Sequence, residues 1–274
     1  GWTAEDNSLR RIQNDAAALA AAAFGIPGFF SPRLPTPYQL LTNPDVRLSA
    51  YDTEPLMRTL ERLVDFDLLN DCQTRLSLGA VEIRSGNFAY FDNRKTRLDA
   101  RHVAASGALP PGFPPIEIDG RHYWDGGLVS NTPLQQVLES GRHARDMLVF
   151  QVDLWPARGD SPSSLGEVAE RLKDIQYSSR TRMITDHMRA KAQHQRELAE
   201  LLTLIPANRR NDPLVQRMQA RAELQRCNVV HLIYQGKPCD GESKDYEFSA
   251  LTMRRHWASG LADMRHSLER PGWL

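Results

Sequence analysis

Hydrophobic and polar positions alternate along the first 157 residues in patterns that predict short helices and strands. Apolar residues recur three and four positions apart between residues 54 and 69, the spacing of an amphipathic helix. Residues 75–83 and 88–91 read as two strands joined by the turn Arg84-Ser-Gly-Asn87, so they predict a hairpin. A short helix follows over residues 99–108, and the pattern predicts that Pro110-Pro111 stops it.

A second hairpin is predicted where Ile116-Glu-Ile118 and His122-Tyr-Trp124 flank Asp119-Gly120, because this dipeptide favours a two-residue turn. Asn131-Thr-Pro133 then opens a helix through Glu139, whose free amides Asn131 or Thr132 can cap. A cap is the expected role of Asn131, and a substrate contact is the alternative. The apolar run of residues 147–154 is typical of a buried parallel strand.

The pattern changes after a linker rich in Pro, Gly and Ser at residues 156–163. Ser164 and Glu167 have capping-box spacing and predict one long polar helix to about Ile205. Further elements are a helix at 213–225, a late strand at 228–234 and a final helix at 249–268. We therefore expect an α/β region over residues 1–157 and a mostly helical region with one late strand over residues 158–274.

The most apolar stretch of the chain lies near its beginning. Residues 15–24 predict a strong helix that Gly25 ends, and residues 25–32 form an apolar loop interrupted by glycines and prolines. Packing of this helix on the core is the simpler interpretation. The alternative is an apolar lip beside a cleft that accepts lipid.

The composition of the chain argues against nucleic acid as a partner and against a membrane-spanning helix. The chain has 274 residues, with 34 Lys and Arg against 34 Asp and Glu, so no basic field favours nucleic acid. No uninterrupted apolar run reaches the roughly 18 residues of a membrane-spanning helix. Three cysteines without ligand or disulfide spacing indicate reduced, partly buried thiols and a cytoplasmic location. The chain opens with Gly1-Trp-Thr3, without an initiator Met or a signal peptide.

Histidines and cysteines offer no metal site in the sequence. His187 and His194 share one predicted helical face, but seven residues of helix separate them by roughly 10 Å, too far to bind one ion. Cys72 follows Asp71, which disfavours a thiolate nucleophile. No cofactor and no metal are therefore expected.

Asp125-Gly126-Gly127 is the best candidate for chemistry. It places a carboxylate at the end of a predicted strand, before two glycines that permit a close backbone approach. The same three residues also make an ordinary turn, and spacing alone leaves both interpretations open.

The surrounding segment resembles the patatin-like phospholipases, whose second catalytic signature is Asp-Gly-Gly or Asp-Gly-Ala. The similarity covers residues 105–106, 113–115, 119–120, 125–127 and 131–133. Residues 51–56, 85–88, 90–93, 231–234 and 243–248 look like the bacterial branch that carries an extra C-terminal region. The resemblance implies a three-layer α/β/α hydrolase domain, of which this chain looks like the C-terminal part.

The resemblance also implies a serine–aspartate dyad without histidine, acting on lipid esters. Asp125 would accept the proton of the serine, and Gly126 and Gly127 would let the loop place it. The family's Gly-x-Ser-x-Gly elbow and its glycine-rich oxyanion loop are both missing from these residues. Ser106 falls in the frame Ala104-Ala-Ser-Gly-Ala108 and is a poor nucleophile candidate.

We expect a lipid acyl hydrolase whose N-terminal part, with the nucleophile elbow, is missing here, so that this chain alone is inactive. A non-catalytic scaffold that binds lipid or a partner is the alternative, and an esterase acting on a storage polyester or a small ester is a third. Basic residues predominate on the predicted long helix, which indicates a solvated face or a partner helix. Contact with the anionic headgroups of a membrane surface is the alternative there. The sequence gives no oligomeric state.

Overall fold

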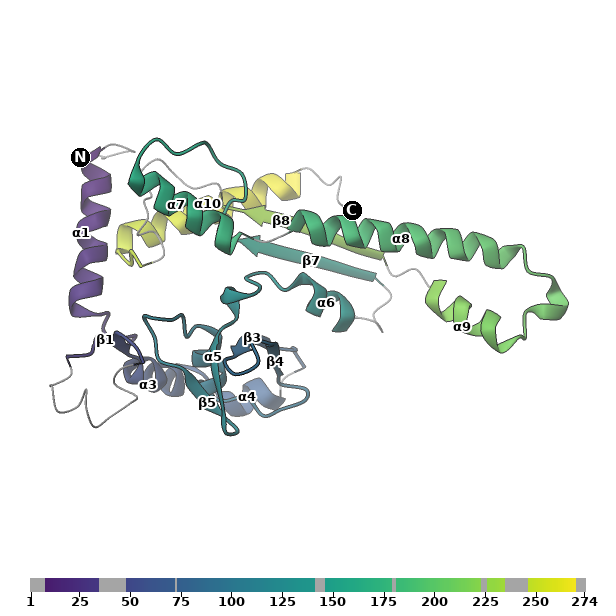
Figure 1. The fold of residues 1–274 in the computed structure, drawn as a ribbon, viewed down its shortest axis with the longest axis horizontal. Helices are drawn as coiled ribbons and strands as arrows, with labels where there is room; N and C mark the ends of the chain where they lie inside the picture. The colour runs from purple at the N-terminus through teal and green to yellow at the C-terminus, as the bar shows by residue number, and fades with distance from the viewer. Residues whose placement is uncertain are drawn as a thin grey trace.

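The fold is α/β, as expected, and the part of the chain that the structure describes contains three small sheets, with most of its helices beside them (Figure 1). The structure is a computed structural model that describes residues 8–34, 48–71, 73–140, 146–178, 181–222, 226–234 and 246–269. All three cysteines fall outside the residues or side chains so described, so the expectation of buried thiols does too.

The N-terminal helix α1 (Ser8–Phe24) ends where predicted, at Gly25, whose φ of 76° lies in the left-handed region. The loop that follows turns its rings inward. Phe30 is only 5% exposed and lies 4.8 Å from the ring of Tyr51 and 5.4 Å from that of Phe113, centroid to centroid. This geometry supports packing rather than a lipid-facing lip. The loop leads into β1 (Ser31–Pro32), which pairs antiparallel with β2 (Tyr51–Asp52).

Both predicted hairpins are confirmed, and together they form one antiparallel sheet. Its strands are β3 (Ser77–Glu82), β4 (Phe88–Asp92), β5 (Ile116–Ile118) and β6 (Arg121–Asp125), in the order β4-β3-β6-β5. Asp119 and Gly120 have φ values of 51° and 72°, the two positive angles of a type I′ turn. Pairing of β3 with β6 sets Ala80 opposite Asp125.

Helix α5 (Ala100–Ser106) covers this sheet and makes the core with it. Ala105 packs with Ala80, Ile118 and Tyr123, all at most 7% exposed. The last residue of the helix is Ser106, and Gly107 N donates to Ala104 O, so the helix ends two residues before the predicted Ala108 and is not stopped by the proline pair. The small side chains let the helix lie close to the strands.

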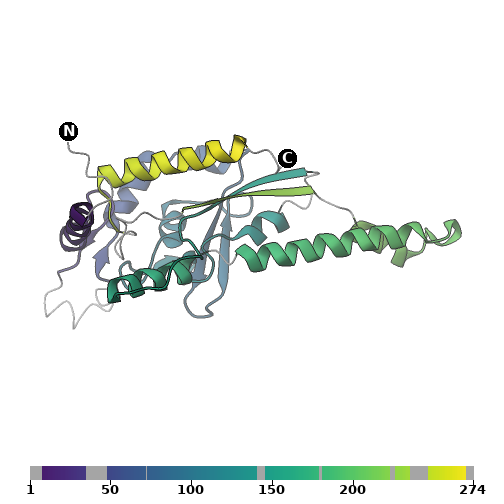
Figure 2. The same cartoon turned by 90° about the horizontal axis from the view of Figure 1, so that it is seen from above.

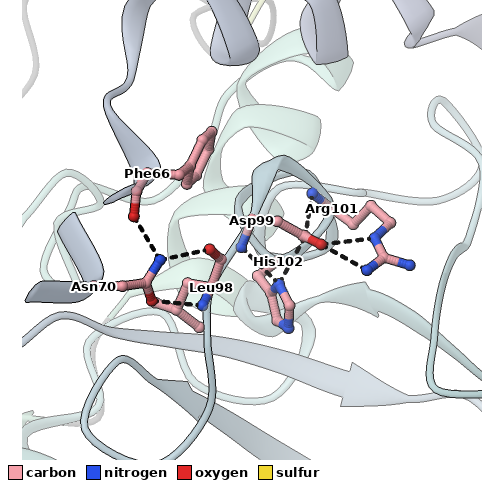
Figure 3. Close-up of polar contacts among 6 residues, drawn as sticks. All are labelled: Phe66, Asn70, Leu98, Asp99, Arg101 and His102. Carbon is pink, nitrogen blue, oxygen red and sulfur yellow. Dashed lines mark hydrogen bonds and ion pairs between the residues drawn. The ribbon is translucent and has the colours of Figure 1, made fainter. Parts of the chain in front are cut away.

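The start of α5 is fixed by polar contacts from a preceding helix (Figure 3). Asn70 pairs with both backbone groups of Leu98: its Nδ2 donates to Leu98 O (2.9 Å), and Leu98 N donates to its Oδ1 (2.7 Å). Asp99 then caps the helix by accepting from Arg101 N at 2.9 Å, and His102 Nδ1 completes the capping box. These contacts fix where α5 begins beside the preceding helix.

The single helix predicted for residues 54–69 is two helices, α3 (Glu54–Leu63) and α4 (Phe66–Asp71). Val64 is extended, with ψ of 121°, and Asp65 caps the second helix by accepting from Leu68 N at 2.9 Å. The periodicity continues across the break, so the pattern alone did not reveal it.

The second half of the chain is built around β7 (Asp146–Asp153) and β8 (Arg226–Ile233), which pair in parallel. It follows α6 (Leu134–Ser140) and contains α7 (Leu165–Tyr177), α8 (Thr181–Thr203), α9 (Pro213–Ala222) and α10 (Ala250–Glu269). The predicted helix from Ser164 to Ile205 is therefore two helices, because α7 ends at Ser178, whose ψ is 142°. Ser164 does cap α7, accepting from Glu167 N at 3.3 Å.

Strand β7 is parallel, as predicted, but it is not buried on both faces. Leu148, Phe150 and Val152 are 44%, 44% and 57% exposed, whereas Val149 between them is 8% exposed. Among the described residues, Leu148, Phe150 and Val152 therefore form a partly exposed apolar row along the strand. Because β8 joins β7, the sheet also crosses the expected division between residues 157 and 158, which stays a prediction.

The two longest described helices, α8 and α10, carry charged residues along their length. Within the described residues, no helix is both long and apolar enough to cross a membrane.

The buried carboxylate of Asp92, at the end of β4, binds the segments on either side of the first hairpin. Asp92 is 1% exposed, and its Oδ2 accepts from Arg75 Nε at 2.6 Å while its Oδ1 accepts from Arg94 N at 3.0 Å. Burial alone would raise its pKa, but these donors and nearby Lys95 outweigh burial and hold the pKa of Asp92 below its ordinary value of 3.8.

We predict that Asp92 makes the free energy of unfolding depend on pH at the acid end. A carboxylate whose pKa is lower in the folded state stabilises the fold above its unfolded pKa, and this stabilisation is lost as pH falls through the folded pKa. Urea unfolding should show stability declining below about pH 4, and Asp92→Asn should be less stable at neutral pH and flatter over this range. Identical pH slopes for both proteins would contradict the assignment.

Candidate functional site

Asp125 is the last residue of β6 and lies where the sheet meets the end of α5. Its N–H donates to Ala108 O at 3.0 Å, just beyond that helix, and its backbone pairs with Ala80 of β3. Two elements therefore fix the backbone from which the carboxylate projects.

The carboxylate of Asp125 is half-buried and held by one backbone donor. Its Oδ1 accepts from Gly127 N at 2.7 Å, which also starts the 3₁₀ turn of residues 126–128. Burial raises the pKa of Asp125 above 3.8, and the Gly127 hydrogen bond offsets only part of that rise. No described serine hydroxyl donates to this carboxylate.

Gly126 is buried and must be a glycine because of its distance from β3. A Cβ there would lie 2.6 Å from Gly79 O and 2.8 Å from Gly79 C, and both are backbone atoms that would have to shift to admit it. The ring of Phe88 closes the same space, 2.5 Å from a Cβ built on Gly79 and 3.2 Å from one built on Gly126. The two backbones thus meet face to face under one aromatic ring.

Gly127 has a different role. A Cβ there would sit 3.2 Å from Asp125 Oδ1 and 3.3 Å from Asn131 Oδ1, tighter than usual but not prohibitive. The residue therefore leaves room for the carboxylate while its own amide positions it.

Asn131 belongs to this loop rather than to the helix that it was predicted to cap. Helix α6 begins at Leu134, and the Nδ2 of Asn131 instead donates to Tyr177 O at 3.2 Å, at the end of α7. The contact ties the Asp125 loop to the helical region of the chain.

The sequence analysis singled out Asp125, Gly126 and Gly127 as candidates but not Gly79 and Phe88, which pack against them. Both lie in the first hairpin, far from Asp125 along the chain, and the structure brings them against it. The available signal was Gly79 itself, because a glycine inside a strand often marks a close approach of another backbone.

Other candidates do not gather around Asp125. His194 is exposed on α8, the side chain of His187 lies outside those described, and Ser106 is the last residue of α5. His231 lies on β8, where burial lowers its pKa despite nearby Asp153. Among the side chains that the structure describes, no three His, Cys, Asp or Glu residues form a group that could hold a metal ion.

Comparison with known families covers most of the chain in two parts. A family model described as patatin-like phospholipase matches residues 5–138, which include Asp125-Gly126-Gly127. A second, described as patatin phospholipase, matches residues 175–274, which include α8, α9, β8 and α10. No curated protein matches the chain.

We predict that Gly126→Ala destabilises the protein because its Cβ would collide with the Gly79 backbone. The free energy of unfolding should fall by about 2 kcal/mol or more. Gly107→Ala is the matched control: a Cβ there meets nothing within 4 Å, so its effect should stay within about 0.5 kcal/mol. Urea denaturation midpoints measure both, and equal midpoints for the two variants would refute the steric argument.

Proposed function

The chain belongs to the patatin-like phospholipase family, and from that premise we propose that Asp125 is the proton acceptor of a serine–aspartate dyad that hydrolyses lipid esters. The observation that carries the proposal is the half-buried carboxylate at the end of β6, oriented by the Gly127 amide within the matched segment.

In this mechanism a serine hydroxyl attacks the ester carbonyl while its proton passes to Asp125. The carbon–oxygen bond to the alcohol then breaks, the alcohol leaves with that proton, and the acyl group stays on the serine. Water, deprotonated by the same carboxylate, attacks the acyl-serine; the bond between the acyl carbon and the serine oxygen breaks, the fatty acid leaves, and Asp125 returns the proton to the serine. No imidazole is needed, because one carboxylate serves both steps.

The surroundings of Asp125 suit a proton acceptor. An ordinary aspartate is too weak a base near neutral pH, and burial brings its pKa closer to the working range. The Gly127 hydrogen bond occupies Oδ1 and fixes the plane of the carboxylate, so Oδ2 is the oxygen proposed to face the serine.

The serine itself is proposed to lie outside these 274 residues, none of which form Gly-x-Ser-x-Gly. The apolar row on β7 supports this reading. Parallel strands are normally covered on both faces, whereas Leu148, Phe150 and Val152 are exposed. Further structure packed on β7 would cover that row.

The same observation favours a second candidate. If this chain acts without a serine, it is a non-catalytic protein that binds lipid or a partner. Ester cleavage by the native protein, and its loss in the Asp125→Asn variant, separates these functions.

We predict that Asp125→Asn in the native protein lowers kcat for ester cleavage at least about 100-fold, because the amide cannot accept the proton. Asp119→Asn is the matched control, since Asp119 lies in the neighbouring turn with φ of 51°, which Asn also adopts. The rate of wild-type cleavage should fall on the acid side at a pH above 3.8, as Asp125 becomes protonated.

The Asp125→Asn substitution should lower the rate of cleavage without lowering the free energy of unfolding. A carboxylate whose folded pKa is raised loses stability as pH rises through that pKa, so Asp125→Asn should be at least as stable as wild type at neutral pH. Retained turnover in the folded Asn variant would overturn the assignment of Asp125.

We predict that the 274-residue chain alone reacts with no fluorophosphonate probe and cleaves no nitrophenyl ester above background. Mass spectrometry of the intact chain measures the labelling, and the heat-denatured chain gives the background. A covalent label on any native serine, Ser106 included, would overturn the prediction and place a nucleophile within this sequence.

A further inference from the structure

Helices α8 and α9 form an antiparallel hairpin that projects far from the rest of the molecule (Figures 1 and 2). Each helix has the other as its main packing partner. Gln195 Nε2 donates to Arg221 O at 3.2 Å, which joins the two helices near the base. The end of the hairpin, residues 201–214, therefore stands free of the sheets.

The tip is apolar where a free polar turn would be expected. Leu204 is 77% exposed, Leu201 60% and Leu214 54%, and Pro206, Ala207 and Pro213 beside them are exposed as well. Three leucines exposed around one short connection are costly in water, and they point to a partner that receives them.

Charge surrounds these leucines. Arg209 and Arg210 are exposed within the same connection, and no described acidic side chain forms an ion pair with either. Residues 190–222 hold six basic side chains against three acidic ones. Apolar side chains rimmed by arginines match the boundary between the headgroups and acyl chains of an anionic bilayer.

We propose that residues 201–214 are a membrane-contact tip that inserts Leu201, Leu204 and Leu214 into a lipid surface while Arg209 and Arg210 bind its phosphate groups. The choice of a lipid surface rests on the proposed lipid-ester activity. It also rests on charge, since two copies joined tip to tip would bring four arginines together, and that repulsion disfavours a second copy.

Vesicle co-sedimentation of the native protein tests the proposal, with phosphatidylcholine vesicles and with vesicles that also contain phosphatidylglycerol. Wild type should bind the anionic vesicles more tightly, and added salt should weaken that binding. Leu204→Ser with Leu214→Ser should weaken binding to both vesicles at least about tenfold. Arg209→Ala with Arg210→Ala should weaken binding to anionic vesicles alone, about fivefold per arginine.

Matched controls come from other exposed positions. Leu165→Ser on α7, at a leucine that is 88% exposed, and Arg254→Ala with Arg265→Ala on α10 should bind as wild type does. The proposal is overturned if wild type binds neither vesicle, if the tip variants bind normally, or if the controls lose as much. Dimers abolished by the leucine changes, with vesicle binding intact, would instead make the partner a second copy.

Failure of this proposal is separable from failure of the dyad. Asp125→Asn should bind vesicles as wild type does while losing hydrolysis, because Asp125 lies on β6 and not in the hairpin. Tip variants should keep cleavage of a dissolved short-chain ester and lose cleavage of esters in vesicles. Loss of both activities in a tip variant would contradict a role confined to the membrane surface.

Discussion

The close approach of Gly126 to Gly79 is the constraint on which the candidate site depends. With no side chain on either residue, β6 can end against β3 while the ring of Phe88 covers the junction. Asp125 is consequently the last residue held by strand pairing, and the chain turns immediately, with Val129 N and Ser130 N both donating to Gly126 O. The position of the carboxylate follows from backbone contact rather than from any side-chain partner.

Local chemistry in the sequence was enough to predict much of the fold. Asp119-Gly120 dictates a turn with two positive φ angles, Gly25 ends α1, and Ser164 caps α7. The break at Val64 was not predicted, because apolar periodicity continues through it, and the break at Ser178 was not predicted, because no glycine or proline interrupts residues 167–205. Nor did the apolar run of β7 reveal its exposed face, since a pattern shows that a strand favours burial and not whether anything covers it.

The candidate site, too, was predicted from the sequence only in part. Asp125-Gly126-Gly127 can be recognised as a motif in the sequence, but the properties that would suit Asp125 to the proposed role of proton acceptor depend on neighbours brought together by folding. Its burial raises the pKa, the Gly127 amide opposes that rise, and Gly79 and Phe88 come from a hairpin distant in sequence. Asn131 was assigned to the wrong contact for the same reason, because its partner, Tyr177 O, lies in another region of the chain.

The parallel pairing of β7 and β8 does not depend on the α8–α9 hairpin, which leaves its tip available for the proposed contact with a lipid surface. Two parallel strands need one crossover connection, and a single helix is enough to make it. The chain between β7 and β8 contains α7, which meets that need, and then a hairpin that contributes no strand and packs mainly on itself. Because it packs mainly on itself, its tip can carry exposed leucines without disturbing the Asp125 loop. The topology thus separates the surface that would meet lipid from the residues that would act on it.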